Sequence, residues 1–125
     1  MSAVCLLVAG MLRATLPTDA FTLQWRHSVE KTLWEEDYRV EAGKLVLTQS
    51  RIEGSGAGMD PPPDATLVDG TWRWRPALPP LPQIRITSSP FTADYRVCWR
   101  GDCHALRELA HSQGIEVVVV APCGG

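Results

Sequence analysis

The sequence predicts a mainly β fold, an antiparallel sandwich or partly closed barrel of about eight or nine short strands with one short helix. Short segments with a period of two recur along the chain and are separated by glycine- and proline-containing turns. Apolar residues at helical spacing occur in one segment only, Asp102–Ser112. With 125 residues, of which 45% are apolar, the chain suits a single domain, residues 1–125, with one hydrophobic core.

The first clear hairpin runs from Phe21 to Val40. Phe21, Leu23 and Trp25 alternate with polar residues, as expected for a half-buried strand. Alternation resumes at Trp34, so Ser28–Leu33 is the predicted connection. The remaining predicted elements, in chain order, are a turn at Ala42-Gly43, a strand at Lys44–Ile52, a hairpin of Ala65–Val68 and Thr71–Arg75 about Asp69-Gly70, an extended crossing at Pro76–Pro82, strands at Gln83–Ser88 and Tyr95–Trp99, a helix at Asp102–Ser112 and a buried final strand at Ile115–Val120.

The apolar run Val4–Leu12 has two interpretations. It can form a strand that ends in a turn at Gly10, or residues 1–12 can contain the core of a signal peptide. No Lys or Arg precedes the run and Arg13 follows it, which favours the strand. On this basis we expect a cytoplasmic location, with a periplasmic or other extracytoplasmic location as the alternative. No apolar run approaches the roughly 18 residues of a spanning helix, so the chain is not expected to cross a membrane.

Charge and cysteine content limit the classes of partner and cofactor. The net charge of −2, with acidic and basic residues interspersed, argues against a nucleic-acid partner. Cys98 and Cys103 could close a disulfide if they face each other, whereas Cys5 and Cys123 could meet only if the first and last strands are neighbours. Small buried hydrophobic cysteines are an equal alternative. His104 could join Cys98 and Cys103 on a zinc ion, but a matched fourth ligand is missing. We therefore predict no metal and no cofactor.

An acid and an imidazole are the candidate polar anchors of a site. Extending the alternation places His27 on the face of Phe21, Leu23 and Trp25, and places Glu36 on the face of Trp34. A hairpin turning near Lys31–Thr32 would set the two opposite or diagonal to each other. They could form a satisfied pair within the core, because neither is stable when buried alone, or they could anchor a ligand in an aromatic-lined site.

No complete catalytic set accompanies this pair. Ser28 follows His27 directly, and neighbours in a strand point to opposite faces. Gly54-Ser55-Gly56 does not have the spacing of a nucleophile elbow. Gly56 and Gly58 could present backbone N–H groups at the mouth of a ligand site, but the Lys-Ser/Thr of a phosphate loop does not follow them.

Several segments taken together resemble a known family. They are His27-Ser28-Val29-Glu30, the Trp34-Glu-Glu-Asp-Tyr38 stretch, Gly56-Ala57-Gly58 before the prolines, Gly70-Thr-Trp72, Pro79-Pro-Leu-Pro82 and the late cysteines. In this order they resemble the uncharacterised bacterial domain-of-unknown-function 1850 family. The resemblance implies genes often placed beside those of TAXI-type TRAP transporters, which are solute-uptake systems. It implies no activity for any residue here.

The predicted function is a non-enzymatic accessory or ligand-binding domain linked to TRAP-type uptake. Its partner would be a small solute or the transporter subunits. The predicted binding residues are His27, Ser28, Glu30, Glu36, Gly56 and Gly58. The alternative is a small hydrolase or metal-dependent enzyme that uses His27 and Glu36.

Overall fold

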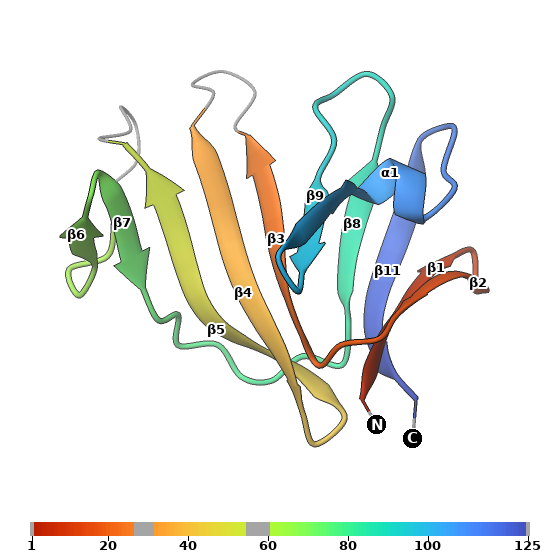
Figure 1. The fold of residues 1–125 in the computed structure, drawn as a ribbon, viewed down its shortest axis with the longest axis horizontal. Helices are drawn as coiled ribbons and strands as arrows, with labels where there is room; N and C mark the ends of the chain where they lie inside the picture. Colours follow the sequence, from red (N-terminus) through yellow and green to blue (C-terminus); the bar gives the residue numbers. More distant parts are fainter. Residues whose placement is uncertain (1, 27–31, 55–60, 125) are drawn as a thin grey trace.

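The chain folds into two antiparallel β-sheets (Figure 1). The computed structural model describes residues 2–26, 32–54 and 61–124. One sheet has the strand order β2-β1-β11-β8 and the other has the order β10-β9-β3-β4-β5-β7-β6. The elements are β1 (Ala3–Val8), β2 (Met11–Leu16), β3 (Ala20–Arg26), β4 (Leu33–Glu41), β5 (Lys44–Glu53), β6 (Thr66–Val68), β7 (Thr71–Trp74), β8 (Ile84–Ser88), β9 (Arg96–Trp99), β10 (Asp102–Ala105), α1 (Leu106–Leu109) and β11 (Glu116–Cys123).

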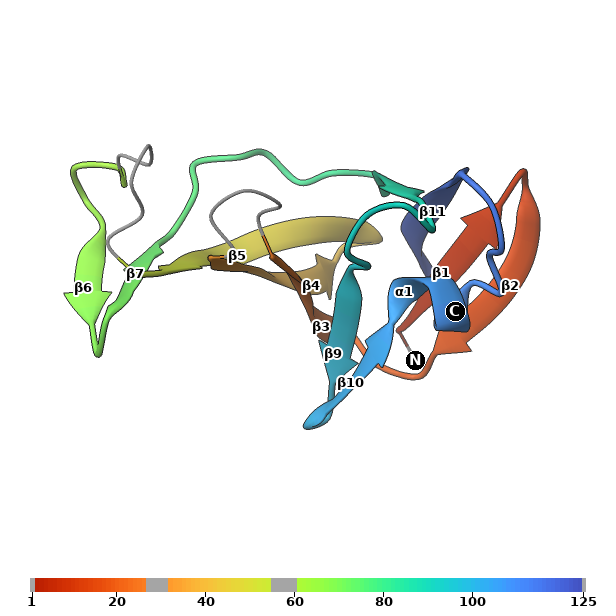
Figure 2. The ribbon, with the colours of Figure 1, turned by 90° about the horizontal axis from the view of Figure 1, so that it is seen from above.

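The predicted sandwich-like, mainly β fold is confirmed, and the sheets do not close into a barrel. The four-stranded sheet and α1 lie at one end of the larger sheet, whereas β7 and β6 extend beyond them (Figure 2). The segment 75–83 connects β7 to β8, and Leu81 forms a bridge to Leu45. This is the extended crossing that the prolines predict.

The core lies where the two sheets face each other. The smaller sheet contributes Val4, Leu6, Val118 and Val120, each at most 1% exposed. The larger sheet contributes alternate residues of its strands, namely Phe21, Leu23, Tyr38, Leu45, Leu47 and Val97. Leu106 and Ala110, in and directly after α1, belong to the same buried cluster. Burial of this apolar surface is the main force that holds the sheets together.

The termini lie side by side because the first and last long strands are neighbours. Val4 pairs with Pro122 and Val8 with Val118 along the β1–β11 ladder. The Cys5 and Cys123 sulfurs are bonded at 2.00 Å across a separation of 118 residues. Figure 1 shows both ends of the chain at the same corner of the molecule.

The apolar run at the beginning of the chain forms two strands. β1 and β2 pair with each other around a turn in which Ala9 and Gly10 both have positive φ, 51° and 77°. The same arrangement closes the Asp69-Gly70 hairpin, with φ values of 50° and 78°, as the Asp-Gly dipeptide predicts. The strands β2 and β10 were not predicted, and with them the described residues contain eleven strands.

The predicted helix Asp102–Ser112 is wrong over its first part. Arg100 and Gly101 adopt φ values of 52° and 85°, so the chain reverses and Asp102–Ala105 pairs with β9 as a strand. Cys103 lies directly opposite Cys98, and their sulfurs are bonded. Only Leu106–Leu109 is helical. The cross-strand pairing therefore overrides the helical spacing of the apolar residues that follow.

The core assignment predicts unequal effects at two leucines of one hairpin. Leu6→Ala removes a fully buried side chain of β1, and we expect it to lower the free energy of unfolding by about 2–5 kcal/mol in urea titration. Leu12→Ala in β2 is the control, because Leu12 is 60% exposed, and its effect should stay within about 0.5 kcal/mol. Equal losses in the two variants would contradict this core.

Candidate functional site

The strands β3, β4 and β5 carry apolar and aromatic residues on one face and polar residues on the other. Across the first hairpin Phe21 pairs with Tyr38, Leu23 with Glu36 and Trp25 with Trp34. The rings stack, with centroids 5.3 Å apart for Phe21–Tyr38 and 5.8 Å apart for Trp25–Trp34. This inner face of the sheet is turned toward the smaller sheet, and Glu36 is the only carboxylate on it within β3 and β4.

A pocket of about 490 Å³ opens on the inner face, where β8 of the smaller sheet passes the first hairpin. We call it the Glu36 pocket. Its aromatic wall consists of Trp25, Tyr38 and Tyr95, and the ring of Tyr95 lies 5.6 Å from that of Trp25. The other lining residues are Leu23, Ile84, Arg85, Ile86 and Thr87. The lining thus combines aromatic and aliphatic side chains with several polar groups, and small-molecule sites likewise use a few polar groups to orient a ligand against apolar walls.

Glu36 is the polar centre of this pocket. The hydroxyl of Tyr38 donates a hydrogen bond of 3.0 Å to Glu36 Oε1. Burial raises the pKa of Glu36 above its ordinary value, and this hydrogen bond offsets part of the rise. Burial, followed by the nearby charge of Glu36, also raises the pKa of Tyr95. The pKa of Tyr38 is raised for the same two reasons and by the hydrogen bond, so its hydroxyl stays a donor at neutral pH.

The opposite, outer face of these strands carries a network of paired charges. Arg51 donates to both oxygens of Asp37, at 2.5 and 2.8 Å, and to Glu35 at 3.3 Å. Thr22 adds a hydrogen bond of 2.6 Å to Asp37, and Gln24 one of 2.7 Å to Glu35. Burial alone would raise the pKa of Asp37, but the bonds from Arg51 and Thr22 and the charges of Arg51 and Arg73 lower it below its ordinary value.

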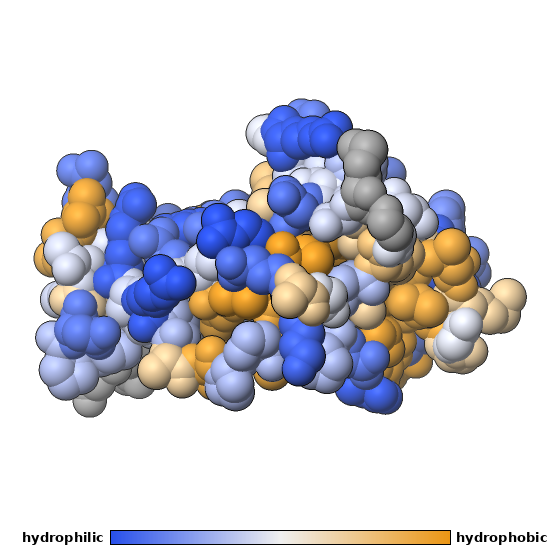
Figure 3. All heavy atoms as spheres, turned by 90° about the horizontal axis from the view of Figure 1, so that it is seen from below, coloured by the Kyte–Doolittle hydropathy of each residue, from blue (hydrophilic) through white to orange (hydrophobic). Residues whose placement is uncertain are grey.

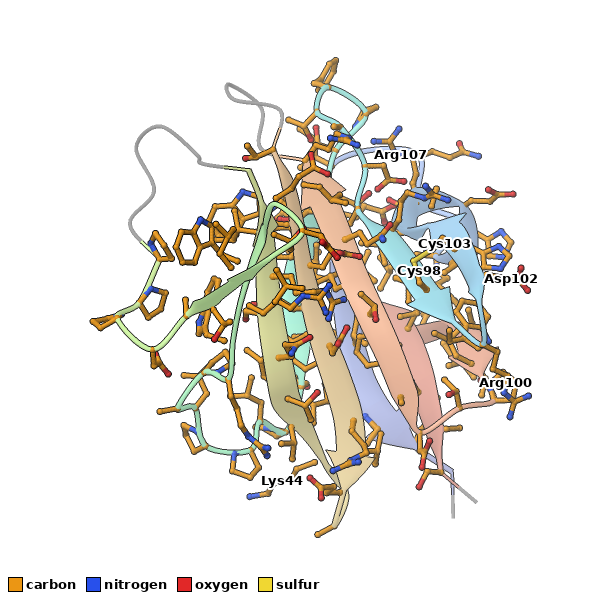
Figure 4. The ribbon with its side chains drawn as sticks, turned by 60° about the vertical axis from the view of Figure 1, so that its left-hand side comes forward. Lys44, Cys98, Arg100, Asp102, Cys103 and Arg107 are labelled. Carbon is orange, nitrogen blue, oxygen red and sulfur yellow. A yellow bond between two sulfur atoms is a disulfide. The ribbon has the colours of Figure 1, made fainter. Side chains whose placement is uncertain are left out.

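A larger basin of about 710 Å³ lies on this outer face, between the network and the β9–β10 hairpin. Cys98 and Cys103 line it, and Figure 4 shows their disulfide within that hairpin, with Arg100 and Asp102 toward its tip. The basin is bigger than the Glu36 pocket, but its carboxylates Glu35 and Asp37 are already bonded to Arg51. We therefore place the candidate binding site at the Glu36 pocket, where the carboxylate has no cationic partner among the residues that the structure describes.

Of the six predicted binding residues, the structure describes Glu36 and places it in the pocket. His27, Ser28, Glu30, Gly56 and Gly58 lie outside the described residues. The register corrects the expected cross-strand pairing of Glu36. Leu23 lies directly opposite Glu36, and Phe21 and Trp25 lie diagonal to it. Apolar residues therefore occupy the positions around Glu36 at which the sequence predicted His27. This register continues to the end of β3, where Arg26 pairs with Leu33.

The three aromatic residues of the pocket were absent from the predicted set. Trp25 and Tyr38 were detectable, because the alternation already places them on the face of Glu36. Tyr95 was not, since its position depends on the pairing of β9 with β3, in which Leu23 lies opposite Val97. This long-range pairing has no local sequence signal.

The alternative interpretation of the sequence is a small hydrolase or metal-dependent enzyme. No group of three or more His, Cys, Asp or Glu side chains among the described residues could hold a metal ion.

The part of the chain that the structure describes also contains no helix that is long and apolar enough to cross a membrane. Figure 3 shows apolar areas near the middle of the molecule and at the end that carries the smaller sheet, with hydrophilic residues between them.

The fold and the pocket define a mainly β, sandwich-like domain with a carboxylate at an aromatic-walled cavity. Residues 21–106 match the family model described as Domain of unknown function (DUF1850). The chain belongs to this family. The match runs from β3 to the start of α1 and includes every residue that lines the Glu36 pocket. No curated protein and no solved structure matches the chain.

Glu36 and Asp37 are adjacent carboxylates on opposite faces, and we expect opposite pH dependences when each is neutralised. Folding raises the pKa of Glu36 above its ordinary value of 4.5. Its contribution to the free energy of unfolding is therefore fully present below pH 4.5 and is lost as the pH rises through the pKa of the folded protein. Glu36→Gln should therefore be more stable than the wild type at neutral pH, with a gain that disappears on acidification.

Asp37→Asn should behave in the reverse way. The lowered pKa of Asp37 stabilises the fold above pH 3.8, and this contribution is lost as the pH falls through the folded value. The variant should be less stable than the wild type at neutral pH and approach it in acid. Urea unfolding across about pH 2–7 measures both differences. Parallel pH profiles for the two variants would be inconsistent with the assignment of the faces.

Proposed function

We propose that this chain is a non-enzymatic binding domain that holds a small solute in the Glu36 pocket and serves a TRAP-type (TAXI) uptake system. The observation that supports it most is the pocket itself. A partly buried carboxylate and three aromatic rings surround a volume that fits a small molecule. A carboxylate in such a place raises the free energy of the unliganded fold, which is a common feature of functional sites.

The link to uptake rests on the family. The chain belongs to DUF1850, and the resemblance implies genes beside TAXI-type TRAP transporters. A small binding domain beside such a system would hold the transported solute or contact the transporter's own subunits. Both roles use a preformed pocket or surface, without a catalytic set.

We further propose an oxidising compartment as the place of action. Two disulfides, Cys5–Cys123 and Cys98–Cys103, include all four cysteines. Disulfides form and persist outside the cytoplasm and are rare inside it. This supports the extracytoplasmic alternative over the expected cytoplasmic location.

Solute binding should depend on the aromatic wall of the pocket. A panel of solutes taken up by TAXI-type systems is titrated against the chain, with tryptophan fluorescence as the readout because Trp25 lines the pocket. For a solute that binds, Tyr95→Ala should weaken the affinity about ten-fold or more. Phe91→Ala is the matched control from the same β8–β9 connection, because Phe91 is 84% exposed and does not line the pocket. No binding by any solute, or equal weakening in both variants, would overturn solute binding at this site.

The transporter link is tested by co-purification. A tagged chain expressed with a TAXI-type binding protein and its membrane subunits from the same organism should retain at least one of them at physiological salt. A tagged, unrelated β-sandwich protein is the control for adhesion to the resin. Recovery of no subunit, with the chain folded and oxidised, would end the proposed link while leaving solute binding to be judged by the fluorescence titration.

A further inference from the structure

Among the described residues, one carboxylate oxygen of Glu36 has no hydrogen-bond donor. Oε1 accepts from Tyr38, whereas Oε2 has no donor among the described residues and is not one of the fully buried side-chain oxygens. Glu36 also forms no ion pair within the described ranges, in contrast with Glu35 and Asp37 on the outer face, which share Arg51. A carboxylate that is partly withdrawn from water is stabilised by a cationic, hydrogen-bonding partner.

The walls of the pocket select the kind of cation. Trp25, Tyr38 and Tyr95 line the same pocket as Glu36, and Leu23, Ile84 and Ile86 are the aliphatic residues of its lining. Aromatic ring faces attract ammonium groups, and the attraction grows when water is excluded. A metal ion would need several oxygen or nitrogen ligands, and this pocket offers one carboxylate. An anion would be repelled by the same carboxylate.

We propose that the Glu36 pocket binds a small molecule with a protonated amine on a compact apolar skeleton. The ammonium N–H groups donate to Glu36 Oε2, and the apolar part lies against Trp25 and Tyr95. This assignment rests on the proposed binding function and adds the chemical class of the solute.

The other charged and titratable groups around Glu36 are compatible with this assignment. Tyr38 on the same strand and Tyr95 in the β8–β9 connection have raised pKa values, so both are neutral at physiological pH. From β8, Arg85 lines the rim and is exposed to solvent. No ion pair joins Arg85 to Glu36 among the described residues. Exposure to water screens the charge of Arg85.

Three probes with one ring and different charges test the class of ligand. Benzylammonium, benzyl alcohol and benzoate are each titrated against the oxidised chain at about pH 7.5, where the first probe is cationic and the last is anionic, with the indole N–H of Trp25 and the ring of Tyr95 followed by NMR. Benzylammonium should produce saturable shifts, benzyl alcohol should bind about ten-fold more weakly or worse, and benzoate should leave these signals unmoved. Lowering the pH through the pKa of Glu36 should weaken the binding of benzylammonium, which stays charged.

Glu36→Gln should reduce the affinity for benzylammonium about ten-fold or more. Glu35→Gln is the matched control, because it removes the same charge from the neighbouring residue on the opposite face. Its affinity should equal that of the wild type. Equal effects of the two variants, or equal binding of benzyl alcohol and benzylammonium, would overturn the amine assignment while a binding pocket remained. Absence of pocket shifts with all three probes would also overturn it, and the solute titration would then decide the binding function separately.

Discussion

The pairing of β3 with β4 is the constraint on which the rest of this structure depends. Leu23 opposite Glu36 places the aromatic residues and this carboxylate on the inner face, and Glu35 and Asp37, which pair with Arg51, on the outer face. A slip of β4 by one residue would exchange the two faces of that strand. Glu35 and Asp37 would then be buried against the smaller sheet, and the rings of Trp34 and Tyr38 would face water.

The two faces use the same residue types for different purposes. On the outer face Arg51 holds Asp37 in a bidentate pair and also bonds Glu35, and the bond and charge of Arg51 lower the pKa of Asp37. On the inner face Glu36 has the hydroxyl of Tyr38 and no cation among the described residues, which leaves its pKa raised. This difference, and not pocket size, distinguishes the proposed binding site from the larger basin.

Local signals predicted much of the fold and only part of the site. Alternation in Phe21–Trp25 and in Trp34–Val40 predicted β3 and β4 and the face on which Glu36 lies. The Asp69-Gly70 dipeptide predicted the turn between β6 and β7. The exact register, the strand Asp102–Ala105 and the position of Tyr95 depend on pairings between distant or competing segments, for which periodicity carries no information. The predicted set therefore includes the carboxylate that lines the candidate pocket and omits the other residues described in its wall.

The most direct test is where the Glu36 side chain lies. In a ¹³C-edited NOESY spectrum, the side-chain protons of Glu36 should show contacts with the methyl groups of Leu23 and the ring of Tyr38. Contacts with the side chains of Thr22 and Arg51 instead would place this carboxylate on the outer face and contradict both the pocket and its proposed ligand.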